Sequence, residues 1–427
     1  MKKGKLGHKN RVKNLVIALS LTAIILSVST YAWFVGMRTV SVTNFDVTIA
    51  GTEDLQLSLN GATWKDTVAI NAENFDDDTS TVYEGNTNWW SGGGLIPMSS
   101  VGDIDSTVSR MILFEKASLT PSLGGYRLIA SRAENDVDYD VPGYVAFDLF
   151  IKNSSGTQYI EEYQPLDEEA IYLSTDSQVT VSASGVANTG IENSVRVAFA
   201  QIGRVKGTTD TAATITGITC ADVAGSVTGI CTKRAQIWEP NDKAHVVGAI
   251  SWYQTSCKQR TEAGAFIGEF GGCGPFVNGT TYPTYAVAKE ITSGDAVDVY
   301  DGASYNGYVH GTEEVGYKPY VASTTAPAEG TALLESYTYF TDSMKILTGT
   351  ARPQFMTLAP NSITKVRVYI YIEGQDIDNY DFASIGKSIS VQFGFTKQRY
   401  IESDIPGYTA PITTSTTTTE TTTTTAP

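Results

Sequence analysis

KVRVYIYI, residues 365–372, and SISVQFGF, residues 388–395, are the two stretches that decide the fold. Both are rich in β-branched and aromatic residues, which fit the pleated surface of a sheet, and both have the length of a strand. Between them, EGQDIDNYDFASIGK, residues 373–387, has the composition of a loop or a short helical turn. We therefore expect two strands joined by a loop near the C-terminal end of the folded body.

Shorter segments of similar composition recur through the chain, separated by Gly, Asn, Asp and Ser. They cover residues 39–50, 55–59, 126–131, 143–152, 170–173, 178–183 and 194–202, whereas residues 71–90 have the polar composition of a surface loop. Short strands at this spacing indicate antiparallel sheets and not a parallel sheet with crossover helices. The predicted fold class is all-β: an antiparallel, jelly-roll-like β-sandwich with a cysteine-containing insertion and a disordered Thr-rich tail.

The N-terminus has the layout of an export signal. Six of the 30 Lys and Arg residues lie within the first 13 positions, and the apolar run LVIALSLTAIILSV follows at residues 15–28. This pattern predicts a signal peptide, residues 1–32, cleaved between Ala32 and Trp33. Apolar residues continue to Met37 and reach the roughly 20 that a spanning helix needs, so an uncleaved membrane anchor is the alternative. Either reading places the body outside the membrane, in an extracellular, cell-surface location.

Three parts of the chain differ in composition. Residues 1–32 are the leader, residues 33–407 are the expected β-sandwich body, and residues 408–427 form the Thr-rich tail. A tail that ends in TTTTETTTTTAP has too little apolar surface to offset the entropy of ordering it. Within the body, the strand pattern is interrupted at about residues 207–350, which we interpret as an insertion or a second small domain.

All four cysteines fall in this insertion: Cys220, Cys231, Cys257 and Cys273. An even number of cysteines in an exported chain predicts disulfide bonds. Three connectivities are open, and closeness in sequence favours Cys220 with Cys231 and Cys257 with Cys273. A zinc site is the competing reading, but the spacing contains no CxxC and no paired histidines.

The charge of the chain excludes one class of partner. The formal net charge is −16, and without the leader 24 basic residues face 46 acidic ones. Nucleic-acid binding needs clustered Lys and Arg to displace counterions from phosphates. We therefore expect no nucleic-acid partner.

No catalytic motif stands out. The chain has three histidines and lacks GxSxG, HExxH and Walker-type patterns. Two carboxylates alone can hydrolyse a glycoside, but the sequence nominates no such pair. The expectation is a protein that is not an enzyme and has no cofactor.

Acidic and aromatic clusters are the candidate ligand sites. Asp136, Asp138 and Asp140 alternate along an extended segment, and calcium favours such hard oxygen ligands, although the segment completes no EF-hand. Asp76–Asp78 and the set Asp376, Asp378 and Asp381 are similar, and triplets of this kind usually lie in solvated loops. Four tryptophans could stack on sugars, but such residues more often pack in a core: Trp89, Trp90, Trp238 and Trp252.

Several separated segments resemble one family of exported proteins. They are STYAWF at 29–34, VTNFDVTIAG at 42–51, YVAFDLFIKNSSG at 144–156, IYLSTDSQVTV at 171–181, ENSVRVAFAQIG at 192–203, AQIWEPND at 235–242, VRVYIYIEGQDIDNYD at 366–381 and SISVQFGF at 388–395. In this order they resemble the TasA/camelysin-like fibre and biofilm-matrix proteins of Firmicutes. The longer chain, the cysteine-bearing insertion and the Thr-rich tail depart from the compact members of that family.

The resemblance implies a jelly-roll subunit that a dedicated signal peptidase processes and that assembles head to tail. The freed N-terminal strand of one subunit would complete a sheet of the next. Here the donor would be residues 39–50, with Val40, Val42, Phe45, Val47 and Ile49 as apolar contacts. The spacing between Val42 and Phe45 breaks the alternation and predicts a bulge or a bend there.

Three functions remain open at this stage. The first is a secreted fibre or biofilm-matrix subunit whose partners are copies of itself, with the membrane met only during export. The second is a surface adhesin or glycan-binding protein on a membrane anchor, whose insertion binds cell-surface glycans or host proteins. The third is a secreted glycan-active enzyme, which would need a concave pocket with perturbed carboxyl groups.

Overall fold

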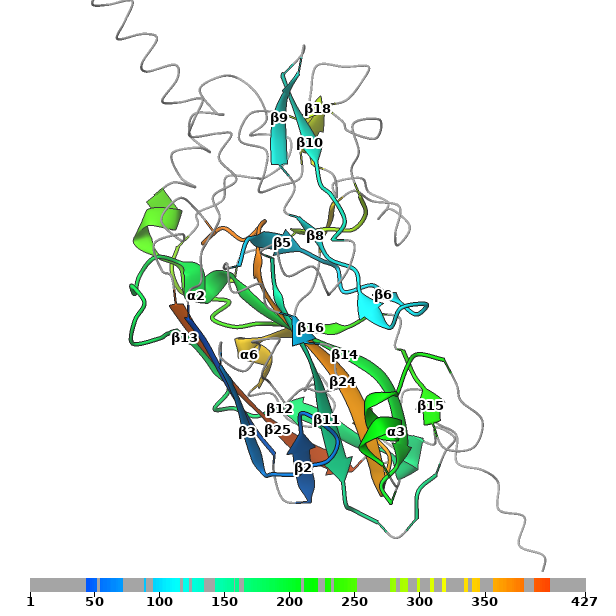
Figure 1. Ribbon diagram of the computed structural model, residues 1–427. Coiled ribbons are helices and arrows are strands. Elements are labelled where there is room, and N and C mark those ends of the chain that lie inside the picture. Colours follow the sequence, from blue (N-terminus) through cyan, green and yellow to red (C-terminus); the bar gives the residue numbers. More distant parts are fainter. Residues whose placement is uncertain are drawn as a thin grey trace, which may run out of the picture.

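The fold is that of a computed structural model, in which two main sheets pack face to face as a β-sandwich (Figure 1). The structure describes residues 44–51, 54–71, 88–89, 95–115, 118–122, 125–133, 143–156, 158–160, 165–208, 211–221, 227–231, 234–251, 277–281, 285–290, 298–299, 308–310, 317–319, 334–336, 340–345, 356–379 and 388–399. Most strand pairs are antiparallel, which confirms the predicted fold class.

The first sheet has six strands and contains both the first and the last described strand. Its order is β23 (Met356–Leu358), β12 (Glu169–Leu173), β25 (Ser388–Arg399), β1 (Asn44–Ala50) and β3 (Thr67–Asn71), and β13 (Gln178–Val181) also pairs with β25. β1 and β25 run parallel, although β1 and β3 are antiparallel. The two ends of the described chain therefore meet in one sheet.

The second sheet has ten strands. Its main order is β2 (Leu55–Ser58), β11 (Val145–Asn153), β24 (Ser362–Glu373), β14 (Val195–Lys206), β16 (Gln236–Glu239) and β22 (Phe340–Thr341). Four shorter strands join it: β4 (Asn88–Trp89), β5 (Pro97–Ser99), β8 (Phe114–Glu115) and β15 (Val227–Gly229). Because β15, β16 and β22 fall within residues 207–350, that range contributes strands to this sheet.

Smaller elements complete the structure. Three minor sheets comprise β9 (Ser118–Ser122), β10 (Gly125–Ile129) and β18 (Asp298–Val299); β17 (Tyr285–Val287) and β21 (Leu334–Ser336); and β19 (Tyr308–His310) and β20 (Tyr317–Pro319). A fourth is the hairpin of β6 (Ile104–Asp105) and β7 (Arg110–Met111). Four helices with fully described bounds are single turns: η3 (Pro165–Asp167), α2 (Ile191–Ser194), α3 (Ala212–Thr216) and α6 (Asp342–Lys345).

The main core fills the space between the two large sheets. Phe199 of β14 meets Phe393 and Phe395 of β25 edge to face, with ring centroids 5.3 and 6.1 Å apart. On β24, alternate residues from Val366 to Ile372 point into the same core. Edge-to-face contacts are a preferred packing of aromatic rings, so they stabilise the register between the sheets.

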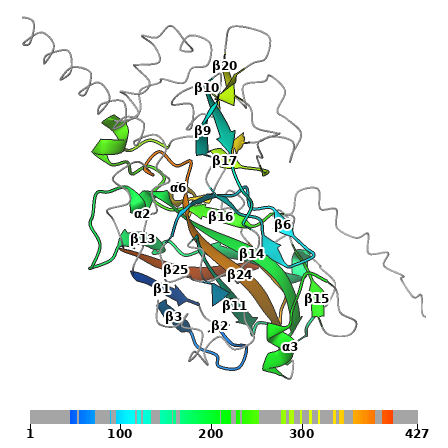
Figure 2. The same ribbon diagram turned by 45° about the horizontal axis from the view of Figure 1, so that its top comes forward.

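The outer face of the ten-stranded sheet is also covered. Tyr369 and Tyr371 of β24 point to this side and lie in a second buried cluster with Met111, Ile215 and Ile237. α3 and β15 lie beside the end of β14 and β24 (Figure 2). All twelve residues of β24 are buried as a result. Its apolar and aromatic residues face both sides of the sheet, and five buried polar or charged residues interrupt them: Ser362, Thr364, Lys365, Arg367 and Glu373.

Candidate functional site

β1 lies inside a sheet, not at its edge. Asn44–Ala50 pairs with Ser388–Gly394 of β25, and Asp46–Ala50 pairs with Thr67–Asn71 of β3. We call the position that β1 fills between β25 and β3 the β1 slot. Within the described chain β3 pairs with no strand other than β1, so an empty slot would separate β3 from its sheet.

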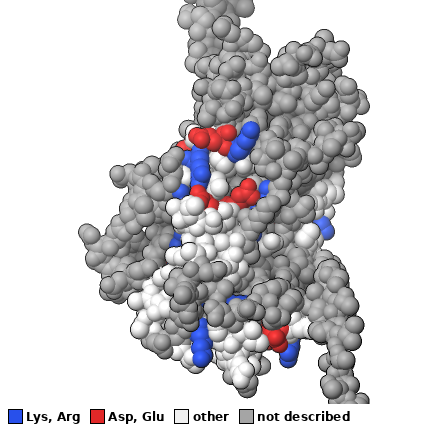
Figure 3. Space-filling view, turned by 90° about the vertical axis from the view of Figure 1, so that its right-hand side faces the viewer, with Lys and Arg blue, Asp and Glu red and all other residues white. Residues whose placement is uncertain are grey.

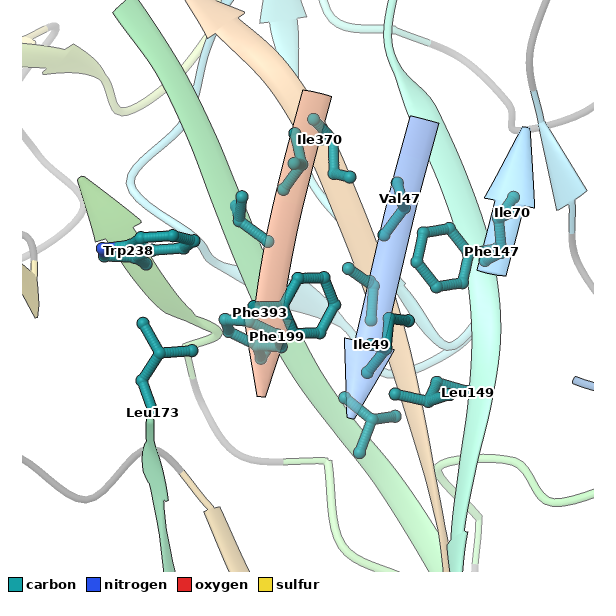
Figure 4. Packing of buried hydrophobic residues seen from close by; sticks show 14 of the residues in the cluster. Val47, Ile49, Ile70, Phe147, Leu149, Leu173, Phe199, Trp238, Ile370 and Phe393 are labelled. Carbon is teal, nitrogen blue, oxygen red and sulfur yellow. The ribbon is translucent and has the colours of Figure 1, made fainter. Parts of the chain in front are cut away.

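Alternate side chains of β1 enter the core. Val47 and Ile49 are 1% and 0% exposed, whereas Thr48 and Ala50 are exposed. Figure 4 shows Val47 and Ile49 in the same buried cluster as Phe147 and Leu149 of β11. Burying a side chain of this size is worth about 1.5–3 kcal/mol, so these two residues hold the strand in its slot.

A short link joins β1 to the opposite sheet. Residues 51–54 lead from Ala50 to Leu55, the first residue of β2. Gly51 donates its N–H to the Asp66 carbonyl at 2.8 Å, and a Cβ there would lie 3.0 Å from the Leu55 oxygen. Asp54 has φ 65°, a left-handed conformation that costs energy in a residue other than glycine. The two described residues of this link, Gly51 and Asp54, are thus a closely packed glycine and a left-handed aspartate.

The predicted donor and cleavage residues are only partly described. Val47 and Ile49 are buried, and the backbone of Phe45 pairs with Ile389, but its side chain lies outside the described set. Val40 and Val42, and with them the predicted bulge, lie outside the described residues. So do the predicted cleavage residues Ala32 and Trp33.

A network of buried ionisable side chains lies near α2. The Arg196 guanidinium donates to Glu239 Oε1 at 2.7 Å and to Asp376 Oδ2 at 2.5 Å. The Asp378 N–H donates to Asp376 Oδ1 at 2.8 Å, and Asp378 Oδ2 lies 2.7 Å from His245 Nδ1. The expectation that Asp376 and Asp378 lie in a solvated loop is therefore wrong, because both carboxylates are buried and paired.

The surroundings of His245 set its charge. Its Nδ1 faces the Asp378 carboxylate and its Nε2 faces the Thr280 carbonyl, each at 2.7 Å. Both partners are acceptors, so both ring nitrogens must carry a proton for both bonds to form. Burial alone would lower the pKa of His245, but the hydrogen bond and charge of Asp378 outweigh it and raise that pKa. The pKa of the Asp378 carboxyl is raised by burial, yet the Val246 N–H and His245 bonds both favour its ionised form.

A second ion cluster lies on the outer face of the ten-stranded sheet. Arg367 binds Asp148 with two hydrogen bonds of 2.8 and 3.2 Å, and Lys365 Nζ lies 3.1 Å from Asp148 Oδ2. Burial lowers the pKa of Lys365, against the opposing charge of Asp148. Arg196 and Arg367 each interrupt an apolar strand, and this pattern is the sequence signal that could have revealed both clusters.

The other predicted sites divide between described and undescribed residues. Cys220 and Cys231 form the expected disulfide, with Cα atoms 5.0 Å apart. They pack against the second buried apolar cluster, which contains Tyr369 and Tyr371. Cys257 and Cys273 lie outside the described residues, as do Asp136, Asp138 and Asp140. Among the residues that the structure describes, no group of three His, Cys, Asp or Glu side chains could hold a metal ion.

The aromatic candidates offer no sugar platform in the described part of the chain. Trp238 is fully buried in the main core and donates its Nε1–H to Asp342 Oδ1 at 2.8 Å. Trp89 lies in β4, with its side chain outside the described set, and Trp90 and Trp252 are not described. Trp238 is therefore a core residue and not part of a sugar-binding surface.

The described surface carries charges of both signs. On the face drawn in Figure 3, acidic and basic side chains lie close together. Mixed charges give a weaker long-range field than a patch of one sign. In the described ranges, no helix is long and apolar enough to cross a membrane.

Comparison with protein-family models, with curated proteins and with solved structures gives no match.

Proposed function

We propose that this protein is a secreted, cell-surface structural subunit that assembles into a fibre or matrix by exchanging β1 between copies. The observation that carries the proposal is the interior place of the described N-terminal strand, between the C-terminal strand β25 and β3. A strand in this position can be supplied by the same chain or by another copy of it.

Exchange conserves the contacts of β1. A β1 from a second copy would form the same ladder with β25 and β3 and bury the same Val47 and Ile49 side chains. The free energy gained from the new contacts of β1 therefore equals the free energy lost with the old ones. The equilibrium between monomer and assembly then depends on protein concentration and on the free energy of opening the link, as in domain swapping.

The link favours opening. Asp54, at the β2 end of this link, holds a left-handed conformation while β1 and β2 belong to one subunit. A link that extends toward a neighbouring subunit releases this strain. Each copy then gives one β1 and receives one, and such a head-to-tail contact produces a filament or a ring.

A reversible lock on β1 tests the proposal. Thr48 and Ala69 face each other on β1 and β3, and both are exposed, so T48C with A69C places two thiols across the ladder. Paired residues in an antiparallel ladder lie within the range of a disulfide bond. We expect the wild type to form filaments in negative-stain microscopy, the oxidised double variant to stay monomeric, and reduction to restore its assembly.

Two controls accompany the lock. The T48S/A69S variant should assemble like the wild type, and wild-type filaments should be tested in the same reductant because Cys220–Cys231 is also reducible. Deletion of residues 33–50 should abolish assembly. Filaments of normal yield from the fully oxidised lock would overturn strand exchange.

A further inference from the structure

Three side chains from both large sheets meet at one end of the sandwich. Asn153 is the last residue of β11, Lys397 lies on β25, and Glu169 is the first residue of β12. Lys397 Nζ lies 3.2 Å from Asn153 Oδ1 and 3.3 Å from Glu169 Oε2. Asn153 Nδ2 donates to the same Glu169 oxygen at 2.6 Å. The amine, the carboxamide and the carboxylate therefore contact one another pairwise.

Hydrogen bonds fix the orientation of the carboxamide. Its Oδ1 accepts from the Lys397 amine and from the Ser155 N–H, whereas its Nδ2 donates to Glu169 and to the Ala359 carbonyl. The carbonyl side thus faces the amine, and the NH₂ side faces a carboxylate. This is the arrangement that an acyl transfer needs, with the nucleophile at the carbonyl and a proton carrier at the leaving nitrogen.

The site is shielded from solvent. Asn153 is 0% exposed, and the side chains of Lys397 and Glu169 are 13% and 15% exposed. Ser155 donates its hydroxyl to Glu169 Oε2 at 2.6 Å, which holds the carboxylate toward the other two groups. The more exposed Asp54 carboxylate lies 3.8 Å from the amine. Low water content limits competing hydrolysis and keeps the three groups in contact.

We propose that Lys397 and Asn153 form an intramolecular isopeptide bond, with Glu169 carrying the proton. The Lys397 ammonium first gives a proton to the Glu169 carboxylate and becomes a neutral amine. Nζ then attacks Cγ of Asn153, which forms the new C–N bond and moves the carbonyl electrons onto Oδ1. Glu169 returns the proton to Nδ2, the C=O bond re-forms and the Cγ–Nδ2 bond breaks. Ammonia takes the extra proton of Nζ and leaves as ammonium, so the step needs no oxidant or reductant.

A second lysine next to a carboxyl group shows why proximity is not sufficient. Lys365 Nζ lies 3.1 Å from Asp148 Oδ2, but Arg367 binds that carboxylate through both oxygens. The guanidinium stabilises the ionised form, which an amine does not attack. Lys397 instead faces a neutral carboxamide, and its carboxylate partner is a separate residue.

The bond would join the two sheets covalently. Asn153 belongs to the ten-stranded sheet and Lys397 to the six-stranded sheet, 244 positions apart in the chain. Because the three residues lie in one subunit, bond formation does not depend on strand exchange. The cross-link and the assembly can therefore be tested separately.

Intact mass of the purified full chain, after complete reduction of disulfides, tests the proposal. The mass expected for the observed N-terminus should exceed the measured mass by one ammonia molecule. A protease digest should yield a branched peptide that joins Asn153 to Lys397 in tandem mass spectrometry. K397R and E169Q should each restore the full mass, and K206R, at an exposed lysine, should keep the deficit.

The outcomes are distinct. A wild type of full mass whose Asn153 and Lys397 peptides are both linear would overturn the proposal. A deficit that persists in K397R would also overturn it, because asparagine can lose ammonia by cyclisation, for example at Asn278 before Gly279. A deficit that persists in E169Q alone would remove Glu169 from the reaction. The wild-type measurement is decisive even where a variant fails to fold.

Discussion

Arg196 carries a buried charge on the outer face of the ten-stranded sheet, on the same side as Ala198 and Tyr371, and neighbouring oxygens make this possible. Its side chain is 0% exposed and contacts Glu239 and Asp376 as well as the carbonyls of Asn193 and Val195. A charge in a medium of low polarity is tolerated only when it is paired and hydrogen-bonded. The network is therefore sensitive to the loss of any one member.

Replacing Arg196 by methionine tests this sensitivity. R196M keeps an unbranched side chain, two atoms shorter than that of arginine, but leaves the Glu239 and Asp376 carboxylates buried without their cation. We expect the free energy of unfolding to fall by about 3–5 kcal/mol, as measured by urea denaturation. R399M, at an exposed position, is the control and should change it by less than about 0.5 kcal/mol. Equal effects of the two variants would contradict the role of the network.

His245 makes the stability of the protein depend on pH. Its pKa is raised in the folded state, so the folded chain holds the proton more tightly than the unfolded chain. The stabilisation is complete below the unfolded pKa near 6.5 and is lost as the pH rises through the higher folded value. The difference in unfolding free energy between the wild type and H245Q should therefore shrink as the pH rises above 6.5. Urea denaturation at a series of pH values measures it, and a constant difference would contradict the assignment.

At the scale of elements, two backbone segments approach closely where α2 meets the turn after β24. Gly190, at the N-terminus of α2, has φ +91°, and a Cβ there would lie 2.3 Å from the Asp378 carbonyl oxygen. Gly279 has nearly the same φ, +94°, but a Cβ there would have no neighbour within 4 Å. Substitutions at these two glycines therefore distinguish the free-energy cost of a left-handed conformation alone from that of a left-handed conformation with a steric clash.

Alanine substitution at the two glycines should give different results. G279A should lower the free energy of unfolding by about 1 kcal/mol, the cost of a left-handed alanine. G190A adds a clash with backbone and should cost more than about 3 kcal/mol. Thermal and urea unfolding of both variants measure the difference. Similar losses would mean that α2 can shift away from Asp378 at little cost.

The sequence predicts many of the strands but not their neighbours. Alternation and composition locate β11, β14, β24 and β25 within a few residues, because these strands are long and rich in β-branched side chains. β3 and β16 were not predicted, since short strands carry few alternating positions. The parallel pairing of β1 with β25 depends on contacts across most of the chain, which local pattern does not encode.

The candidate sites also divide into those with a local sequence signal and those that depend on contacts between distant parts of the chain. The sequence predicted Val47 and Ile49 as apolar contacts, and both are buried; it also favoured the Cys220–Cys231 pair, which is bonded, because both signals are local. It did not bring together Asn153, Glu169 and Lys397, since each alone resembles an ordinary polar residue at a strand end. Only the packing of the two sheets places them side by side.

At the scale of the whole molecule, the chain forms two sheets and a covering layer on the larger one. The covering layer includes α3 and the Cys220–Cys231 disulfide, and its Ile215 and Ile218 are buried in the same cluster as Tyr369 of β24. A cross-link in this layer restricts the unfolded chain more than the folded one. The layer is therefore held both by apolar contacts and by a covalent bond.

Removal of this disulfide should destabilise the molecule as a whole. The C220S/C231S variant is expected to lose about 3 kcal/mol of unfolding free energy, the loop-closure entropy of a short loop. Urea unfolding of the variant and of the oxidised wild type, in the absence of reductant, measures the difference. Unchanged stability would show that the apolar contacts alone hold the covering layer.

The order of strands in the sandwich also constrains when the protein can fold. β24, buried on both faces, pairs with β11 and β14, and β25 pairs with β1, yet β24 and β25 are the last described strands of the chain. A chain that leaves a ribosome or an export channel N-terminus first presents its early apolar strands long before their partners. Such non-local pairing makes folding slow and leaves strand edges open in the meantime. The synthesis of β24 and β25 thus determines when β1 can dock.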